Sequence, residues 1–417
     1  MKVAIVCDWL VGIGGAERVV LELHELYPDA PIYTSQYDPS KIDWFAGADV
    51  RTTWLQKLPK GLRKFLPALR AWSFSHLNLS DYDLVISASG AEAKGVKTRP
   101  GAVHISYIHS PTHYYWIRYD EYLKSPGFGR LDPLARLGLK LLIGPLRRWD
   151  YKAAQRPDYL IANSSHTQKM IRKFYGREST VIHPPVDTKR FAEPTLSPAM
   201  RASTALGADE QRTEAYMKYG KGAAELATTR GAASVGRMPS PARQQDDTVH
   251  RRGFVTAGRQ TPYKRMDLAV QACTELNLPL IVLGSGPDHK RLKRMAGKSI
   301  TFLRGKSDEE VAHYFQTSLA FIFPGMEDFG IVAVEALAAG TPVIAYKAGG
   351  ALDYIDDGKN GLFFEQQTVK SLLSTLKRFE STTFNSSSVA KSAEKFSAET
   401  FHSAIRKFID NHIQGVK

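Results

Sequence analysis

The chain has 417 residues, of which 43% are hydrophobic and 24% are charged, and its net charge at pH 7 is +14. This balance excludes a disordered chain, and no apolar run approaches the roughly 20 residues that a membrane-spanning helix needs. The length favours two domains of about 150 to 200 residues each, with a cleft between them. The positive charge admits nucleic acid, an anionic membrane surface or phosphorylated substrates as partners.

The first half of the sequence alternates β-rich runs with helical patterns. Its first ten residues read as a buried strand that ends at Asp8 and not as a secretory leader, so we expect a cytoplasmic protein. A helix is predicted from about Ala16 to Leu26, and further strands in PIYTSQY, DLVISAS, AVHISYIHS, DYLIANS and TVIHPPV. Such a rhythm predicts a parallel sheet covered on both faces, which binds ligands at the carboxyl ends of its strands. Residues 1–187 are therefore predicted to form an α/β, Rossmann-like domain.

Three glycines, Gly12, Gly14 and Gly15, follow the first strand and precede the first helix. They let the backbone approach a ligand closely and point amides at negative charge. A tight turn without a ligand is the alternative interpretation. NAD binding is disfavoured, because GIGGAE lacks the third glycine of a dinucleotide fingerprint.

Two basic and apolar stretches, residues 50–80 and 124–148, lie in the first half. The first contains no acid before Ser80 and interleaves cations, among them Arg70, with tryptophan, leucine and phenylalanine. This mixture favours a lipid interface over nucleic acid, so we expect peripheral binding to the inner face of an anionic membrane. The two cysteines, Cys7 and Cys273, are expected to be reduced and buried.

Residues 193–252 break the pattern, since they offer too few apolar side chains for a core, and are predicted to be an insertion or linker. Residues 253–393 repeat the strand and helix rhythm and predict a second doubly wound domain. The segment 394–417 reads as a helix that could cross back to the first domain.

A pair of cations follows the first strand of the second domain. Arg259 ends the strand GFVTAG, and Lys264 comes five residues later in GRQTPYK. Two cations at the carboxyl edge of a strand are well placed for a diphosphate, although a solvated surface pair is the alternative.

Two glutamates frame the start of a later helix. Glu327 lies in the loop after LAFIFPG, and Glu335 is predicted about two turns into the next helix, so one could reach a sugar and the other a ribose. The amides near Phe329, Gly330 and Ile331 form the amino end of that helix, where an anion is favoured.

The combination of GGAE, GRQTPYK and the two glutamates in the spacing E-x7-E, followed by AxGTPVIA, resembles glycosyltransferase family 4. The resemblance covers nearly the whole chain apart from residues 193–252. It implies the GT-B fold, in which two Rossmann-like domains face each other across a cleft. It also implies a retaining transferase that needs no metal and no cofactor other than its nucleotide-diphosphate sugar donor.

The resemblance also implies roles for individual residues of the second domain. Arg259 and Lys264 would bind the donor diphosphate, Glu335 the ribose hydroxyls, and Glu327 would lie beside the transferred sugar. Gly305 and Lys306, which end SITFLRGK, would form the wall against the base.

In the first domain the resemblance implies that Gly15 approaches the donor and that His109, in SYIHSPTHYYW, touches its sugar. Glu17 and His113 are the acceptor-side candidates. No acidic ligand set for a metal lies in a suitable loop, since Asp81 and Asp83 precede a strand and lie at its wrong end.

The stretch HSPTHYYW and the sequence that flanks it look most like mannosyltransferases of bacterial surface-polysaccharide pathways. GDP-mannose is therefore the first expectation for the donor and a UDP-hexose the second, with a saccharide acceptor that is lipid-linked, in polysaccharide or glycolipid assembly. The alternatives are a nucleotide-sugar 2-epimerase and a non-catalytic protein that binds membranes or nucleic acid. The sequence leaves the oligomeric state open.

Overall fold

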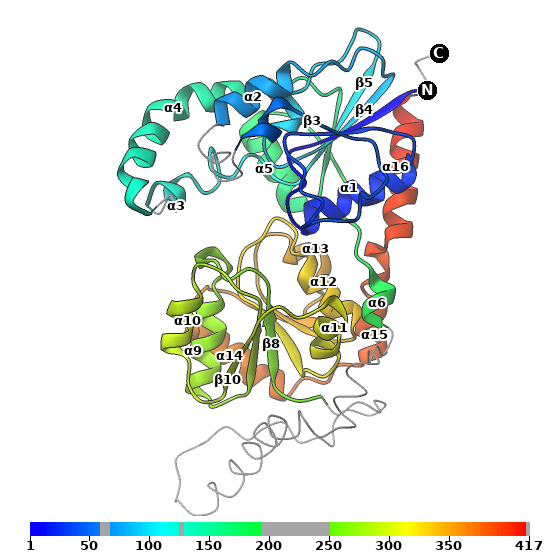
Figure 1. Cartoon of the computed structure of the whole chain (residues 1–417). Coiled ribbons are helices and arrows are strands. Elements are labelled where there is room, and N and C mark those ends of the chain that lie inside the picture. The colour runs from blue at the N-terminus through cyan, green and yellow to red at the C-terminus, as the bar shows by residue number, and fades with distance from the viewer. Residues whose placement is uncertain (59–66, 125–128, 193–250, 414–417) are drawn as a thin grey trace, which may run out of the picture. The chain divides into compact units, whose positions relative to one another are not determined.

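The computed structural model describes residues 1–58, 67–124, 129–192 and 251–413 (Figure 1). They form two compact units: Met1–Pro185 with Ala398–Lys417, and Val186–Ser397. The expected insertion at 193–252 lies outside the described residues except for Arg251 and Arg252.

Unit 1 is built on a parallel sheet of seven strands in the order β3-β2-β1-β4-β5-β6-β7. The central strands β4 and β5 are buried along their whole length, as expected for a sheet covered on both faces, and their buried polar residues Ser87, His104 and Ser106 are hydrogen-bonded to one another. The strands are β1 (Val3–Cys7), β2 (Ile32–Thr34), β3 (Val50–Thr52), β4 (Leu84–Ser89), β5 (Val103–Ile108), β6 (Tyr159–Ala162) and β7 (Thr180–Val181).

The helices of unit 1 include one from the far end of the chain, α16, which packs against α1 (Figure 1). Phe401, Ile405 and Phe408 of α16 recur at helical spacing and enter the same core as Val19 and Leu23 of α1. The helices are α1 (Gly15–Leu26), α2 (Pro67–Ser75), α3 (Tyr119–Lys124), α4 (Asp132–Ala153), α5 (Ser165–Tyr175) and α16 (Ala398–Ile413), with short 3-10 turns at Trp54–Lys57, Ala93–Gly95 and Gly129–Leu131.

Unit 2 contains a parallel sheet of six strands in the order β10-β9-β8-β11-β12-β13. Its strands are β8 (Phe254–Ala257), β9 (Leu280–Leu283), β10 (Ile300–Leu303), β11 (Ala320–Phe323), β12 (Val343–Tyr346) and β13 (Gly361–Phe364). Its helices are α6 (Thr188–Ala192), α9 (Met266–Glu275), α10 (His289–Met295), α11 (Asp308–Gln316), α12 (Ile331–Ala338), α13 (Ala351–Tyr354), α14 (Val369–Glu380) and α15 (Ser386–Lys391), with 3-10 turns at Pro262–Lys264 and Glu394–Phe396. Two parallel α/β sheets confirm the predicted fold class.

Each sheet has a point where the strand order reverses. In unit 1 the chain runs outward from β1 to β3 and then restarts on the other side at β4, and in unit 2 it does the same between β8 and β11. The loops after β1 and β4 in unit 1, and after β8 and β11 in unit 2, therefore diverge at the carboxyl edge of each sheet. This is where open α/β sheets bind ligands.

Two features differ from the sequence analysis. The short edge strand β3 lies inside the stretch that we interpreted only as a basic lipid-facing surface. The helix α12 begins at Ile331, so Glu335 lies about one turn into it and not two. The expectation for the cysteines is confirmed: both are free and buried, and burial raises the pKa of each thiol.

Candidate functional site

The loop after β8 carries the two cations predicted to bind a diphosphate. Arg259 is exposed, and its side chain has no hydrogen-bond or ion-pair partner among the described residues. Lys264 is half-buried at the end of a 3-10 turn, which begins with a proline at Pro262. The loop therefore offers one solvent-facing guanidinium and one sheltered ammonium at the point where the strand order reverses.

The loop after β11, the strand next to β8, carries Glu327 to the side chain of Lys264. Lys264 Nζ donates to Glu327 Oε1 at 2.7 Å, and the two side chains are 13% and 18% exposed. The backbone oxygen of Glu327 accepts a hydrogen bond from the amide of Gly350 at 2.9 Å, which fixes the loop from its other side. Two of the predicted catalytic residues therefore contact each other.

The helix α12 starts directly behind Glu327. Its N-cap is Gly330, whose φ of +90° is a conformation that favours glycine. A Cβ atom at this position would also lie 2.5 Å from the ring of Phe323, so no larger residue fits. No side chain caps this helix end, and its first amides face the carboxyl edge of the sheet. Phe329 is buried, and Ile331 is the first residue of the helix.

The remaining candidates of unit 2 are less closely grouped. Glu335 is half-buried on α12. Gly305 is exposed in the loop after the edge strand β10, and Lys306 pairs with Glu310 at 2.6 Å. This hydrogen bond raises the pKa of Lys306. The Lys306 side chain is thus bound by the following helix α11, so the backbone is the part of this loop that is left to contact a nucleotide base.

In unit 1 the amino end of α1 lies at the corresponding edge. Gly15 is the first residue of this helix, and Glu17 is half-buried in its first turn. Asp8, at the end of β1, accepts hydrogen bonds from the amides of Gly90 at 2.7 Å and Ala93 at 2.8 Å. Burial, followed by the nearby charge of Glu92, raises the pKa of Asp8. Asp8 thereby ties the loop after β4 to β1.

His109 follows β5, the neighbour of β4, and is half-buried. Its backbone oxygen accepts from Asn163 Nδ2 at 2.9 Å, and its ring lies edge-on to Tyr107 with centroids 5.4 Å apart. His113 lies four residues further along the same loop and is also half-buried. The loop that carries both histidines is therefore held in a defined position.

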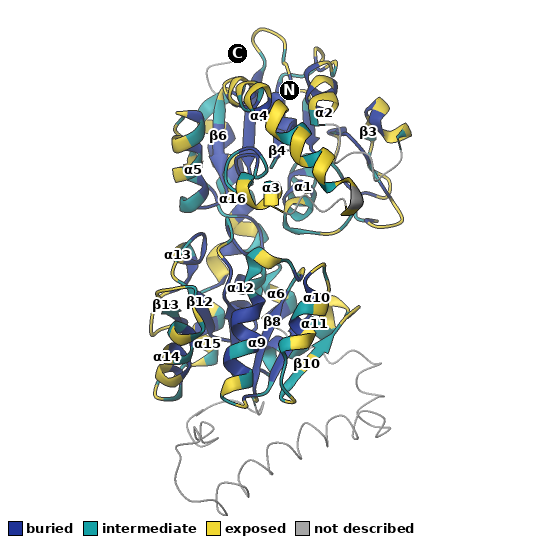
Figure 2. Cartoon of the chain, turned by 90° about the vertical axis from the view of Figure 1, so that its left-hand side faces the viewer, coloured by how far each residue is buried: buried dark blue, intermediate teal, exposed yellow. Residues whose placement is uncertain are grey.

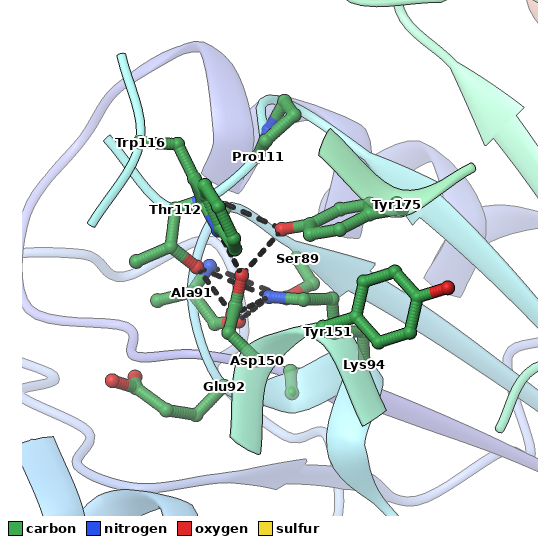
Figure 3. A network of polar contacts seen from close by, with 12 residues as sticks. Ser89, Ala91, Glu92, Lys94, Pro111, Thr112, Trp116, Asp150, Tyr151 and Tyr175 are labelled. Carbon is green, nitrogen blue, oxygen red and sulfur yellow. Dashed lines mark hydrogen bonds and ion pairs between the residues drawn. The ribbon is translucent and has the colours of Figure 1, made fainter. Parts of the chain in front are cut away.

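Sequence analysis missed the residues that hold this loop, the most central of which is Asp150 of α4 (Figure 3). Its carboxylate pairs with Lys94 at 2.7 Å and accepts hydrogen bonds from Thr112 at 2.8 Å and from Trp116 at 2.7 Å. The hydroxyl of Tyr175 donates to it at 2.8 Å. Asp150 is fully buried, and a buried carboxylate is stable only when paired in this way.

A second buried ion pair corrects one part of the sequence analysis. Arg70, which we placed on a lipid-facing surface, is 5% exposed and pairs with Glu92 at 2.8 Å. The hydroxyl of Tyr114 donates to the same carboxylate at 2.7 Å. Phe74 of that stretch is buried too, because α2 packs its inner face on the sheet, and Leu55 is buried in the preceding 3-10 turn.

Cations and uncapped helix amides thus lie together at the carboxyl edge of unit 2, and groups of this kind favour a negatively charged ligand. Among the residues that the structure describes, the three that could share a metal ion, Glu22, Glu25 and His402, lie on α1 and α16. None of them belongs to the loops at either sheet's carboxyl edge, and Glu22 already pairs with His402 at 2.7 Å.

Two family models match the sequence and together span most of it. The model described as Glycosyltransferase Family 4 matches residues 13–190, and the one described as Glycosyl transferases group 1 matches residues 243–408.

Individual relatives match a shorter part of the chain. The GDP-mannose-dependent alpha-(1-6)-phosphatidylinositol monomannoside mannosyltransferase of Mycolicibacterium smegmatis is 31% identical over an alignment of 136 residues, and the match covers 28% of this chain and 36% of that protein. A GDP-mannose-dependent alpha-mannosyltransferase of Corynebacterium glutamicum is 33% identical over 122 residues, 29% of each chain. The alignments thus span about a third of these relatives. Among solved structures, Anabaena HepE in complex with UDP has a TM-score of 0.61 at 17% identity and covers 99% of this chain and 100% of its own.

Proposed function

The chain belongs to glycosyltransferase family 4, and from this we propose that it transfers a hexosyl group from a nucleotide-diphosphate sugar to a saccharide acceptor. The observation that carries the proposal is made where the strand order of unit 2 reverses. There the loop that carries Arg259 and Lys264 is joined to the loop of Glu327 by the contact between Lys264 and Glu327. A diphosphate with its sugar needs cations for the phosphates and a polar group for the sugar, and these three residues supply both.

The chemistry follows from where charge develops. As the bond between the anomeric carbon and the phosphate oxygen breaks, negative charge grows on the departing diphosphate. Arg259, Lys264 and the first amides of α12 would stabilise this charge without a metal ion. We further propose retention of configuration: the acceptor oxygen bonds to the anomeric carbon on the face that the phosphate leaves, and the acceptor proton passes to the leaving diphosphate.

For the donor we propose GDP-mannose. The two relatives named as GDP-mannose-dependent support this choice, and the UDP complex of HepE supports a UDP-hexose as the second candidate.

For the acceptor we propose a lipid-linked saccharide at an anionic membrane surface, to which the chain binds peripherally. The support is the outer face of α4, where Leu134, Leu137 and Leu141 are 68%, 54% and 69% exposed at helical spacing (Figure 2). Lys140 and Arg148 are exposed on the same helix, which has no acid between Pro133 and Trp149. Exposed leucines beside cations favour a lipid interface with anionic headgroups. Among the residues that the structure describes, no helix has the length and apolar character to cross a membrane.

The test is to incubate the purified chain with GDP-mannose and with UDP-hexoses, first alone and then with lipid-linked saccharides. Stabilisation of the fold by one nucleotide sugar identifies the donor, since a ligand that binds the native state raises the melting temperature. Release of free nucleoside diphosphate in equal amount to a glycosylated product establishes transfer. An epimerised nucleotide sugar with no glycosylated product would instead establish a 2-epimerase, and neither product would reject both activities.

A further inference from the structure

The buried side chain of Gln260 lies between Arg259 and Lys264 in sequence, and no role has been assigned to it so far. Its main chain binds the loop after β9 twice: its amide donates to Ser285 O at 2.9 Å and its oxygen accepts from the Asp288 amide at 3.0 Å. Its side chain binds the same segment twice more, through Nε2 to Gly284 O at 2.8 Å and through Oε1 to His289 Nδ1 at 2.6 Å. One glutamine therefore joins two loops at the carboxyl edge of unit 2.

These contacts fix the proton on His289. A backbone carbonyl only accepts, so the group facing Gly284 O is the amide nitrogen of Gln260. The oxygen of Gln260 then faces the imidazole, and His289 must donate to it from a protonated Nδ1. Burial, with the charges of Arg304 and Lys293 after it, lowers the pKa of His289, so that near neutral pH the ring is the uncharged form with one N–H.

The two loops also touch closely. A Cβ atom on Gly286 would lie 2.3 Å from the backbone oxygen of Gln260, so the second loop needs glycine there to approach the first. Gly258, on the other side of Arg259, donates its amide to Leu283 O at 3.1 Å. The backbone on both sides of Arg259 is thus anchored, to the end of β9 on one side and to the loop after β9 on the other, while the Arg259 side chain faces solvent.

We infer that Gln260 and His289 are positioning residues for the reaction: through their hydrogen bond they hold the backbone from which Arg259 and Lys264 reach the donor diphosphate. The inference rests on the proposed function. It assigns no contact with substrate to either residue. Misplacement of a preorganised donor by about 1 Å can cost up to a hundredfold in rate, so a single anchoring side chain can matter for kcat.

The matched test uses two replacements of His289. In His289→Asn the side-chain nitrogen takes the place of Nδ1 and can still donate to Gln260, whereas in His289→Gln it takes the place of Nε2 and cannot. We expect kcat of His289→Asn to stay within about twofold of the native chain and that of His289→Gln to fall about tenfold. Equal kcat values for the two variants would overturn the inference.

A second arm shows whether the effect passes through Arg259. Gln260→Leu should lower kcat about tenfold in the native background and by a smaller factor in Arg259→Ala, where only the effect through Lys264 remains, since residues that act through one another are not additive. The same loss in both backgrounds would overturn the inference. Hydrogen exchange of the backbone amides in residues 258–264 must also be faster in Gln260→Leu than in the native chain. Unchanged exchange would also overturn the inference. If Gln260→Leu does not fold, the comparison of kcat between His289→Asn and His289→Gln alone tests the inference.

Failure of the proposed function has a different signature. In that case the native chain would transfer no sugar, and Arg259→Ala would bind GDP and UDP as tightly as the native chain does. Hydrogen exchange would still show whether Gln260 holds the loop.

Discussion

Lys264 and Glu327 are 63 residues apart in the sequence, and their side chains form a 2.7 Å hydrogen-bonded ion pair. The pair joins the loops after β8 and β11, the two strands between which the chain order of unit 2 reverses. The two charges of the pair offset each other. The guanidinium of Arg259, which has no partner in the described part of the chain, therefore supplies the net positive charge of these three residues in the absence of a ligand.

This arrangement predicts opposite effects of Glu327→Gln on binding and on catalysis. Loss of the carboxylate removes a negative charge beside the diphosphate, so nucleoside diphosphate should bind about fivefold more tightly, as expected for about 1 kcal/mol of a sheltered ion pair. Transfer should nevertheless fall, because Glu327 lies beside the reacting sugar in the proposed function. Calorimetry with GDP and UDP measures the first effect, and weaker binding would show that the carboxylate does not oppose the diphosphate.

Arg259→Ala and Lys264→Ala should each lower kcat by roughly a hundredfold to a thousandfold. The reason is that removing one preorganised donor to developing charge typically costs about 3 to 4 kcal/mol. Donor affinity should fall less than kcat. Because both residues act on one diphosphate in the proposed function, the double variant should lose less than the product of the single effects, as steady-state kinetics would show.

Lys264→Arg is the matched control for these variants. It keeps the charge, but a planar guanidinium does not replace a compact ammonium that is already fitted against Glu327. We therefore expect partial activity. Near-normal kcat for both alanine variants would show that the diphosphate binds elsewhere.

The sequence predicted the architecture well because its signals are local. Continuous apolar strands such as β9 and β11 identify parallel sheets, and glycine loops with charged residues after such strands mark their carboxyl edges. The carboxyl-edge position of Arg259, Lys264 and Glu327 follows from this pattern alone.

The buried ion pairs could not be predicted in the same way. Arg70 and Glu92 are 22 residues apart, and Lys94 and Asp150 lie in different elements, so no spacing rule connects them. A charged residue is also expected at the surface unless a partner of opposite charge is known. Because the pairing of Arg70 with Glu92 is not visible in the sequence, the sequence wrongly predicts an exposed Arg70. Likewise, the role of Gln260 depends on a loop about 25 residues further along the chain.

Transfer should survive complete removal of divalent cations. The expectation rests on the cations and helix amides at the edge of unit 2, which can supply the charge that a metal supplies in other transferases. Turnover is measured with and without excess chelator. A loss of activity that only magnesium or manganese restores would show that these groups are insufficient.

Replacement of the exposed leucines of α4 should weaken membrane binding. The triple variant Leu134→Gln, Leu137→Gln and Leu141→Gln keeps the helix but removes its apolar outer face, so it should float poorly with vesicles that contain anionic lipid. Lys140→Gln with Arg148→Gln should weaken binding about thirtyfold, at about 1 kcal/mol per charge. Leu352→Gln, at another exposed leucine in unit 2, is the matched control and should bind normally. Native-like flotation of the triple variant, or equal binding to neutral vesicles at high salt, would reject the assignment.

His104 should make the fold sensitive to acid. It lies buried on β5, where its Nε2 and the hydroxyl of Ser87 are 2.9 Å apart. Burial, with the charges of Arg156 and Arg177 after it, lowers the pKa of His104 to about 3. In the unfolded chain the same group takes up a proton near pH 6.5, so below that pH the unfolded state binds more protons than the native state.

The free energy of unfolding should therefore decrease as the pH falls from about 6.5 towards 3, by up to about 1.4 kcal/mol per pH unit from this one residue. His104→Gln keeps a polar atom near Ser87 but does not titrate, so its stability should depend less steeply on pH over this interval, even if it is less stable at pH 7. Urea unfolding of both chains at several pH values measures the difference. Parallel pH dependences would show that His104 is already protonated in the native state or that it stays neutral in the unfolded one.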